Sequence, residues 1–181
     1  MICCFVILNA CLFFSCNHEK KYLTGELIAV IDDYPYEYSY YKDSIDYSRK
    51  ICFVFKIKNN ESDTVFVPIN DELKKNYHSS IMVSASNGKI VSLDAYFKNL
   101  INEINPNDSA LIYVRLYEKQ MNKLGFESYV TPPNLVEKIK FNYFIDERDK
   151  KRSISIPNII FTKGSQIKYL YRQVERIYEI E

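Results

Sequence analysis

The sequence contains no tryptophan, only two histidines and only four glycines among its 181 residues. His18 lies close to the N-terminus, so His78 is the histidine on which acid–base chemistry near neutral pH would depend. The adjacent Ser79 and Ser80 do not lie in a G-x-S-x-G nucleophile elbow, and His78 is expected in a surface loop. Four scattered glycines also exclude the usual phosphate-cradling loop. These absences argue against the common hydrolase and nucleotide-binding sites.

Neither sign of charge dominates, since 24 basic and 23 acidic residues give a formal net charge of +1. A chain without a basic excess is not built to hold a polyphosphate backbone, so nucleic acid is not an expected partner. One histidine and one cysteine beyond the N-terminal region cannot complete a zinc site. Asp32, Asp33, Asp43 and Asp46 could gather around calcium, but their spacing is not that of an EF-hand. We therefore expect neither a metal nor another cofactor.

Residues 2–14 are almost wholly apolar and are followed by Ser15, Cys16 and a polar run. An apolar stretch of this kind is typical of a secretory signal and is shorter than the ~20 residues of a membrane-spanning helix. The segment Phe13-Phe14-Ser15-Cys16 resembles the lipobox of bacterial lipoproteins. The resemblance implies that the leader is cut before Cys16, whose sulfur carries a diacylglycerol. The protein would then be held to a membrane of the cell envelope, at its periplasmic face or at the cell surface.

Phe14 departs from the small residue that is usual in a lipobox, and no Lys or Arg precedes the apolar stretch. Residues 8–11 are a rival match, although cleavage there would leave a very short apolar core. An uncleaved membrane anchor and a wrongly chosen start codon are the alternatives. The lipobox reading divides the chain into a signal peptide (1–15), a tether (16–24) and one domain (25–181).

The cysteines follow from this division. Cys3, Cys4 and Cys11 leave with the leader and Cys16 carries lipid, so that Cys52 alone remains in the folded domain. A single cysteine cannot form an internal disulfide. Because Cys52 lies inside a strand pattern, we expect a small, semi-buried apolar residue, with a reactive thiol as the alternative.

Alternating apolar residues predict strands over most of the domain. The clearest strand is 51–58, in which Ile51, Phe53, Phe55 and Ile57 face one side. Asn87-Gly88 predicts a hairpin between 80–84 and 89–93. Further strands are expected at 25–31, 64–69 and 110–116, and a second hairpin is expected to join 138–145 to 153–156.

Three segments favour helices. Residues 93–104 carry apolar side chains at helical spacing, although a strand there is an alternative. Residues 118–124 are expected to form a short helix that ends at Gly125, which suits the C′ position. The tail from 167 to 177 keeps a helical rhythm, while its Tyr and Ile content also suits a last strand.

Seven or so short strands separated by turns predict a mainly β domain, an antiparallel immunoglobulin-like β-sandwich with one to three short helices. The segments KIKNNESDTVFVPIN and INPNDSALIYVRL resemble immunoglobulin-like domains of Bacteroidota-type lipoproteins whose function is uncharacterised. The resemblance covers only part of the chain. It implies a fold, and no catalytic residue is carried across with it.

Three tripeptides resemble the general O-glycosylation motif of Bacteroidota, in which Asp precedes Ser or Thr and then a small or aliphatic residue. The acceptors that this resemblance implies are Ser44, Thr64 and Ser109. The alternative is that Asp, Ser and Thr gather in turns in any protein.

A tyrosine-rich segment is the other candidate site. Its alternating residues are Tyr34, Tyr36, Tyr38 and Tyr40. Tyrosine offers rigid apolar area with a polar tip, which suits a protein or glycan partner. The same alternation is equally typical of an edge strand that packs on the core.

The functional hypothesis is an exported, lipid-anchored protein that acts as a non-enzymatic binding or structural module. The alternative is a carboxylate-dependent hydrolase of envelope polymers or glycans, since folding can bring two carboxylates together from anywhere in a chain. A deep acidic cleft would favour the hydrolase, and a surface with exposed tyrosine would favour the binding module.

Overall fold

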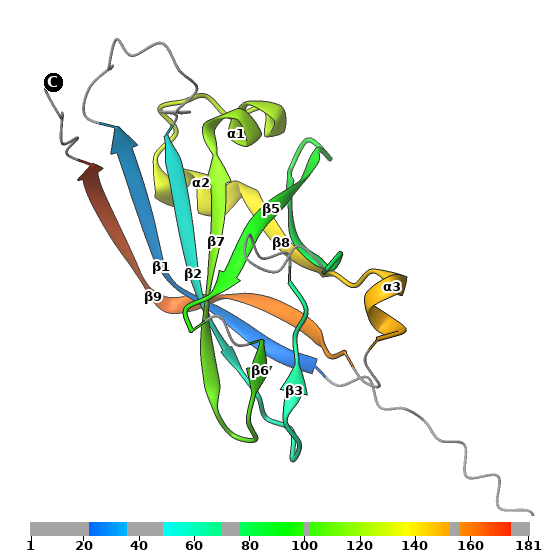
Figure 1. The fold of residues 1–181 in the computed structure, drawn as a ribbon. Helices are drawn as coiled ribbons and strands as arrows, with labels where there is room; N and C mark the ends of the chain where they lie inside the picture. The colour runs from blue at the N-terminus through cyan, green and yellow to red at the C-terminus, as the bar shows by residue number, and fades with distance from the viewer. Residues whose placement is uncertain (1–21, 36–48, 70–76, 100–101, 153–155, 175–181) are drawn as a thin grey trace, which may run out of the picture.

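The computed structural model describes residues 22–35, 49–69, 77–99, 102–152 and 156–174, in which strands predominate (Figure 1). In chain order the elements are β1 (Tyr22–Pro35), β2 (Lys50–Lys58), β3 (Val65–Phe66), β4 (Ser80–Ala85), β5 (Ile90–Phe97), β6 (Glu103–Ile104), β7 (Ser109–Tyr117), α1 (Glu118–Leu124), α2 (Pro132–Lys138), β8 (Ile139–Phe144), α3 (Glu147–Lys150) and β9 (Asn158–Val174). The prediction of a mainly β chain with a few short helices is confirmed.

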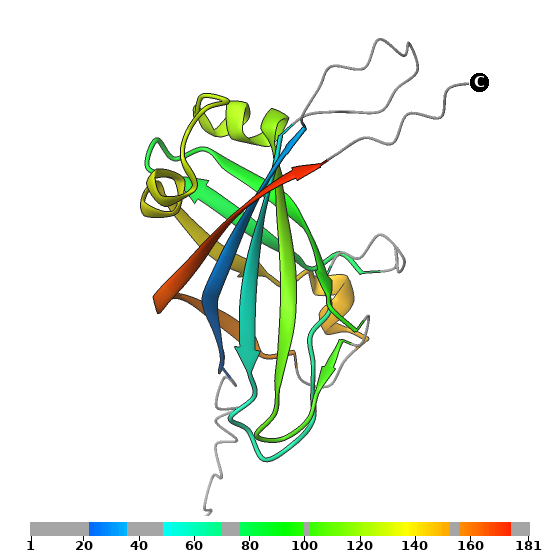
Figure 2. The same ribbon diagram turned by 90° about the vertical axis from the view of Figure 1, so that its left-hand side faces the viewer.

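Seven strands form one sheet in the order β8-β4-β5-β7-β2-β1-β9, and β3 pairs separately with β6. All neighbours in the large sheet are antiparallel except β1 and β9, which run parallel. The sheet curls strongly into a half-barrel, so that its edge strands β8 and β9 converge (Figure 2). Seven of the described strands therefore make one curled, mixed sheet and not a clear antiparallel sandwich.

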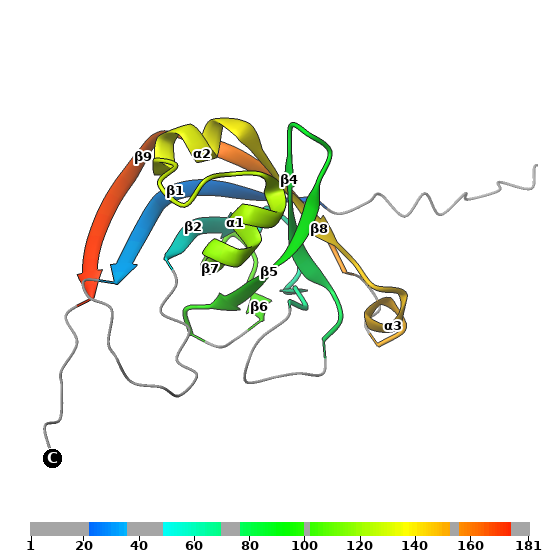
Figure 3. The ribbon, with the colours of Figure 1, turned by 90° about the horizontal axis from the view of Figure 1, so that it is seen from above.

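The core lies inside the curl. Ile51, Phe53, Phe55 and Ile57 alternate along β2 and are all buried, which confirms the face predicted for this strand. Their partners on β7 are inward-facing as well, because directly opposed residues of paired strands share one face of the sheet. Helices α1 and α2 lie across one end of the curl, where they bury further apolar side chains (Figure 3).

Two local predictions are confirmed. The Asn87-Gly88 turn joins β4 to β5, with Val83 opposite Val91. Helix α1 spans the predicted residues and ends at Gly125, whose φ of 87° is left-handed. Only glycine adopts that conformation without strain, so this helix stop was readable from one residue.

The helix predicted over 93–104 is wrong. Strand β5 continues to Phe97, and Glu103–Ile104 form β6. Leu93, Ala95 and Phe97 are buried at every second position because Ala95 and Phe97 pair with residues of β7. The apolar residues also fit helical spacing, but pairing with β7 makes this segment an extended strand. In a strand every second side chain faces the core.

The helix predicted from 167 is also wrong as far as residue 174. Residues Asn158–Val174 form β9, which pairs in parallel with β1 along most of its length. The side-chain pattern of this segment suits both a helix and a strand. It is a strand because its backbone pairs with β1. Residues 175–177 of this prediction lie outside the described part.

The predicted second hairpin is wrong in its partner. Strand β8 lies where a strand was expected, but it pairs with β4, so that Phe141 faces Val83. Residues 153–155 lie outside the described part, and the next strand, β9, joins β1.

Helix α2 was not expected, although its proline at the first turn is typical of a helix start. At the other end of the chain, β1 begins at Tyr22, within the predicted tether.

Candidate functional site

Most of the residues singled out from the sequence as sites lie outside the described part: Cys16, Ser44, Tyr36, Tyr38 and Tyr40. Tyr34 lies in β1, and its side chain is not described. Neither the lipidation site nor the tyrosine segment is therefore placed relative to the sheet. Both remain predictions from the sequence.

The other two proposed glycosylation sites lie at one end of the molecule. The exposed Thr64 hydroxyl donates to Asn105 Oδ1 at 3.1 Å. Ser109 is partly exposed at the start of β7, where its backbone N–H donates to Asp108 Oδ1 at 2.7 Å. Asn59 joins the turn that precedes Thr64 to the turn that precedes Ser109. Its Nδ2 donates to the backbone oxygens of Ile104 and Asn105, both at about 3 Å. These contacts agree with the alternative that Asp, Ser and Thr gather in turns. Thr64 and Ser109 are nevertheless accessible to solvent, as a glycosylation site requires.

The calcium hypothesis does not agree with the positions of its two described aspartates, while Asp43 and Asp46 lie outside the described part. Asp32 and Asp33 are consecutive in β1 and so point to opposite faces of the sheet. Inside the curl, Asp32 binds Arg49 through two bonds of 2.8 and 2.6 Å. On the outer face, Asp33 binds Arg172 through bonds of 2.7 and 3.0 Å. Among the described residues, no cluster of three or more His, Cys, Asp or Glu could hold a metal ion.

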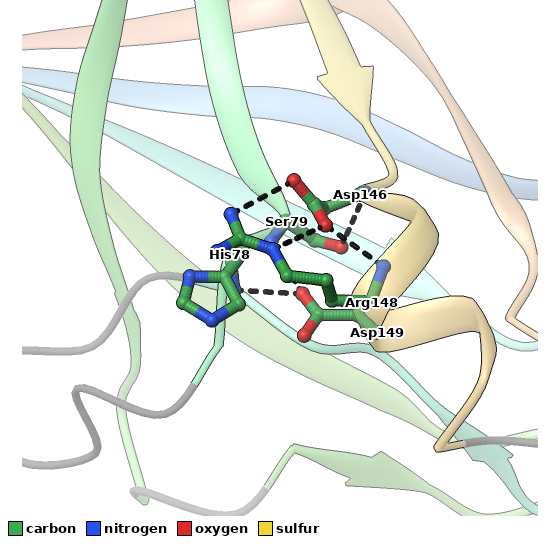
Figure 4. A network of polar contacts seen from close by, with 5 residues as sticks. All are labelled: His78, Ser79, Asp146, Arg148 and Asp149. Atoms are coloured by element: carbon green, nitrogen blue, oxygen red, sulfur yellow. Dashed lines mark hydrogen bonds and ion pairs between the residues drawn. The ribbon is translucent and has the colours of Figure 1, made fainter.

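A polar network surrounds His78 and Ser79, the residues considered for acid–base chemistry (Figure 4). The buried Asp149 of α3 accepts hydrogen bonds from the backbone N–H groups of both residues, at 2.7 Å from His78. Asp146 caps α3 by accepting from the backbone N–H of Arg148 at 2.8 Å, and its own N–H donates to Ser79 Oγ at 3.1 Å. The network joins the end of β8 and α3 to the start of β4.

The arrangement of this network is that of a structural clamp. Ser79 is fully buried and its hydroxyl accepts a backbone hydrogen bond, so it is not presented to a substrate. Asp149 is bonded to the main chain of His78, and Figure 4 shows the imidazole ring directed away from the Ser79 hydroxyl. The hydrogen bond from the Arg148 side chain lowers the pKa of Asp146 to about 2, so that this carboxylate stays ionised.

Cys52 lies on the outer face of the sheet and is buried beneath its neighbours. Burial raises the pKa of its thiol to about 11. Because the nucleophilic form is the thiolate, this environment favours the prediction of a small buried residue over that of a reactive thiol.

One hollow in the described part is a groove of about 330 Å³ between the two edge strands, β8 and β9. Its lining comes from β1, β2, α2, β8 and β9: Leu27, Phe55, Val136, Ile139, Lys140, Phe141, Asn142, Phe161, Thr162 and Lys163. We call this the seam groove. Its apolar residues are buried or partly buried, while the four polar ones are exposed at its mouth.

Three phenylalanine rings form the floor of the seam groove. The rings of Phe55 and Phe141 meet edge to face with centroids 4.9 Å apart, and those of Phe55 and Phe161 do so at 4.8 Å. Phe141 on β8 and Phe161 on β9 lie 6.1 Å apart, so the aromatic contacts cross the seam. Side-chain contacts therefore join the edge strands β8 and β9, which are not neighbours in the hydrogen-bonded sheet.

Gly164 explains why β9 follows β1 so closely and then departs from it. A Cβ atom on Gly164 would lie 2.5 Å from the backbone oxygen of Leu27, which no real side chain tolerates. Immediately beyond it the register shifts, so that Leu27 pairs with Lys163 but Ala29 pairs with Lys168. This bulge bends β9 beside the seam groove, as bulges do at sheet edges.

The width of the seam determines what can enter. Cα atoms of β8 and β9 approach within 8 Å of each other. A strand inserted between them would need about 9.6 Å, twice the ~4.8 Å spacing of neighbouring strands. Where β8 and β9 come nearest, the seam therefore has no room for an added β-strand. Sequence patterns could not reveal this site, because its residues come from five elements.

None of the described helices is long and apolar enough to cross a membrane. No protein-family model matches this chain, and its comparison with curated proteins and with solved structures finds no match.

Proposed function

We propose that this chain is a non-enzymatic binding module of the cell envelope, in which the seam groove takes an apolar or amphipathic ligand. Lipid on Cys16 holds the module to a membrane. The observation that carries the ligand-binding part is a hollow with an aromatic floor and a polar mouth, located where the curled sheet fails to close. Small-molecule sites are commonly concave and mostly apolar, with a few polar groups that orient the ligand.

The bonding of the buried carboxylates supports a non-enzymatic role. Two of these buried carboxylates, Asp32 and Asp33, are each bound by an arginine. A glycoside hydrolase instead needs two carboxyl groups that flank the bond to be cut and are free to meet the substrate. Carboxylates that are held by cations are poorly suited to that role.

Two sequence resemblances support export and anchoring: the lipobox that ends at Cys16 and the immunoglobulin-like segments. The second of these covers residues 56–70 and 104–116, and the described residues 56–69 lie beside 104–116, since β2 pairs with β7 and β3 with β6. An immunoglobulin-like relationship is part of the proposal on this basis. Glycans on Ser44, Thr64 and Ser109 are a further part, supported by the solvent access of Thr64 and Ser109.

The anchor is tested by intact mass and membrane fractionation of wild type and Cys16→Ala in a related bacterial host. We expect wild type to lose residues 1–15, to gain the mass of acyl chains and to partition with membranes, and the variant to do none of these. If both proteins remain unprocessed, or both are soluble, the envelope assignment is wrong. The same spectra show whether glycan mass is added at the three acceptors.

Ligand binding is tested separately with N-phenyl-1-naphthylamine, an uncharged apolar fluorescent probe. Val136→Phe enlarges a side chain of the groove lining and is expected to weaken probe binding. Ile90→Phe is the matched control, because Ile90 is 59% exposed and lies outside the lining. Equal probe binding by wild type and both variants would contradict the role of the groove.

A further inference from the structure

We propose that the ligand of the seam groove is a free, single-chain fatty acid, whose carboxylate is held by Lys140 and Lys163. The inference rests on the proposed function, in which this groove binds a ligand. It adds the chemical class of that ligand, its length and the residues that select it.

Charge at the mouth of the seam groove favours an anion. The described lining contains two lysines and neither Asp nor Glu. Lys140 comes from β8 and Lys163 from β9, so the two strands that flank the seam each supply one cation. Both lysines are exposed, which keeps their ammonium groups hydrated and able to meet a carboxylate at the surface.

Size and width favour one alkyl chain. The volume of about 330 Å³ is at the lower end of the range for small-ligand pockets. A methylene takes about as much room as a water molecule in the liquid, roughly 30 Å³, so about ten of them fill the groove. A diacyl lipid would leave most of its chains outside. The narrow seam and the phenylalanine floor suit an extended aliphatic chain, which needs no hydrogen-bond partner.

The position of the groove relative to the proposed anchor agrees with such a ligand. Leu27, in the lining, lies five residues beyond Tyr22, where β1 begins. At ~3.3 Å per residue this is about 16 Å along the strand. The six residues from Cys16 to Tyr22 add at most about 21 Å at ~3.5 Å per residue. With Cys16 in a membrane, the groove would lie within about 37 Å of a surface where single-chain amphiphiles collect.

The first test is a chain-length series. Saturated fatty acids of eight to sixteen carbons displace the fluorescent probe from the full-length protein, below their micelle concentrations. Affinity is expected to rise about fourfold per methylene while the added groups are buried. It should then level off near twelve carbons, because the groove is filled. A rise that continues unchanged to sixteen carbons would overturn the assignment of length.

The second test concerns the carboxylate. Dodecanoate is expected to bind about two- to tenfold more tightly than dodecanol, the strength typical of one or two exposed ion pairs. The double variant Lys140→Gln/Lys163→Gln should remove this preference and leave dodecanol unchanged. Lys168→Gln is the control, since Lys168 lies on the same strand, beyond the bulge and outside the lining. Any binding of dodecanoate or dodecanol to the apolar residues 1–15 is the same in wild type and in both variants. It therefore does not affect the differences between these proteins.

The outcomes separate this inference from the proposed function. If wild type binds the acid and the alcohol equally, and Val136→Phe still weakens both, the groove binds an apolar ligand but the fatty acid assignment is wrong. If neither compound displaces the probe and Val136→Phe has no effect, the inference and the ligand-binding function are both wrong. If anionic phospholipid vesicles bind and free fatty acids do not, the free acid is not the ligand.

Discussion

Replacing Arg49 by methionine is the perturbation whose effect the structure predicts best. The side chain of Arg49 is 4% exposed and that of Asp32 is 3% exposed, so bulk water compensates neither charge. Two bonds of 2.8 and 2.6 Å join them, and Arg49 also donates to the backbone oxygen of Ser128 between α1 and α2. The pair therefore links β1, β2 and the helices that close one end of the curl.

In Arg49→Met the Asp32 carboxylate stays buried without its cation. Breaking a buried ion pair in this way costs about 3–5 kcal/mol of the free energy of unfolding. For a domain of this size the loss corresponds to a fall in Tm of roughly 6–20 °C. Replacing both partners by apolar residues, in Asp32→Leu/Arg49→Met, removes the buried charges together and should restore stability to within about 2 kcal/mol of wild type.

Urea unfolding followed by far-UV circular dichroism measures both variants, because the chain has no tryptophan to report on folding. Equal m-values in all three proteins are required for the comparison. The reasoning fails if Arg49→Met loses less than about 1 kcal/mol, since the pair would then be no stronger than one at the surface. It also fails if the double variant is as unstable as the single one.

Three further predictions follow from single contacts. Gly164→Ala places a Cβ atom 2.5 Å from the Leu27 backbone oxygen, so we expect a loss of about 1–3 kcal/mol in a thermal melt, whereas Ser165→Ala should have little effect. Asp149→Asn removes a charged acceptor from the backbone N–H groups of His78 and Ser79 and should cost about 1–3 kcal/mol, with faster amide exchange at these two residues as the measurement. The pKa of Cys52 is raised from 9.0 to about 11, so the folded state keeps the thiol proton that the unfolded state loses first. Its contribution of about 2–3 kcal/mol is complete below pH 9 and declines as the pH rises toward 11, and a Cys52→Ala variant that shows the same decline would refute this.

Where the physics is local, the sequence was sufficient to predict the structure. The inward face of β2 followed from apolar residues at alternate positions, and the Asn87-Gly88 turn identified the β4–β5 hairpin. The end of α1 followed from Gly125, because one residue's backbone preference determines a C-cap.

Where two states were close in local preference, the neighbouring strands decided. Residues 93–97 and 167–174 have apolar residues at spacings that suit a helix or a strand, and each is a strand because β7 or β1 offers a hydrogen-bonding edge. The partner of β8 could not be read from order along the chain either. The nearest expected strand was 153–156, but burial of Phe141 and Tyr143 against β4 selected another partner.

The sequence by itself determined that the chain is mainly β, which residues of its clearest strand face inward and where its tightest turns and helix stop lie. These properties depend on the side-chain period and on backbone preferences that act within a few residues. Only the tertiary structure decided that seven of the strands form one curled sheet, with β9 parallel to β1 and a groove where β8 meets β9. Those features depend on the accumulated twist of seven strands and on contacts such as Phe141 with Phe161, between residues that no local pattern connects.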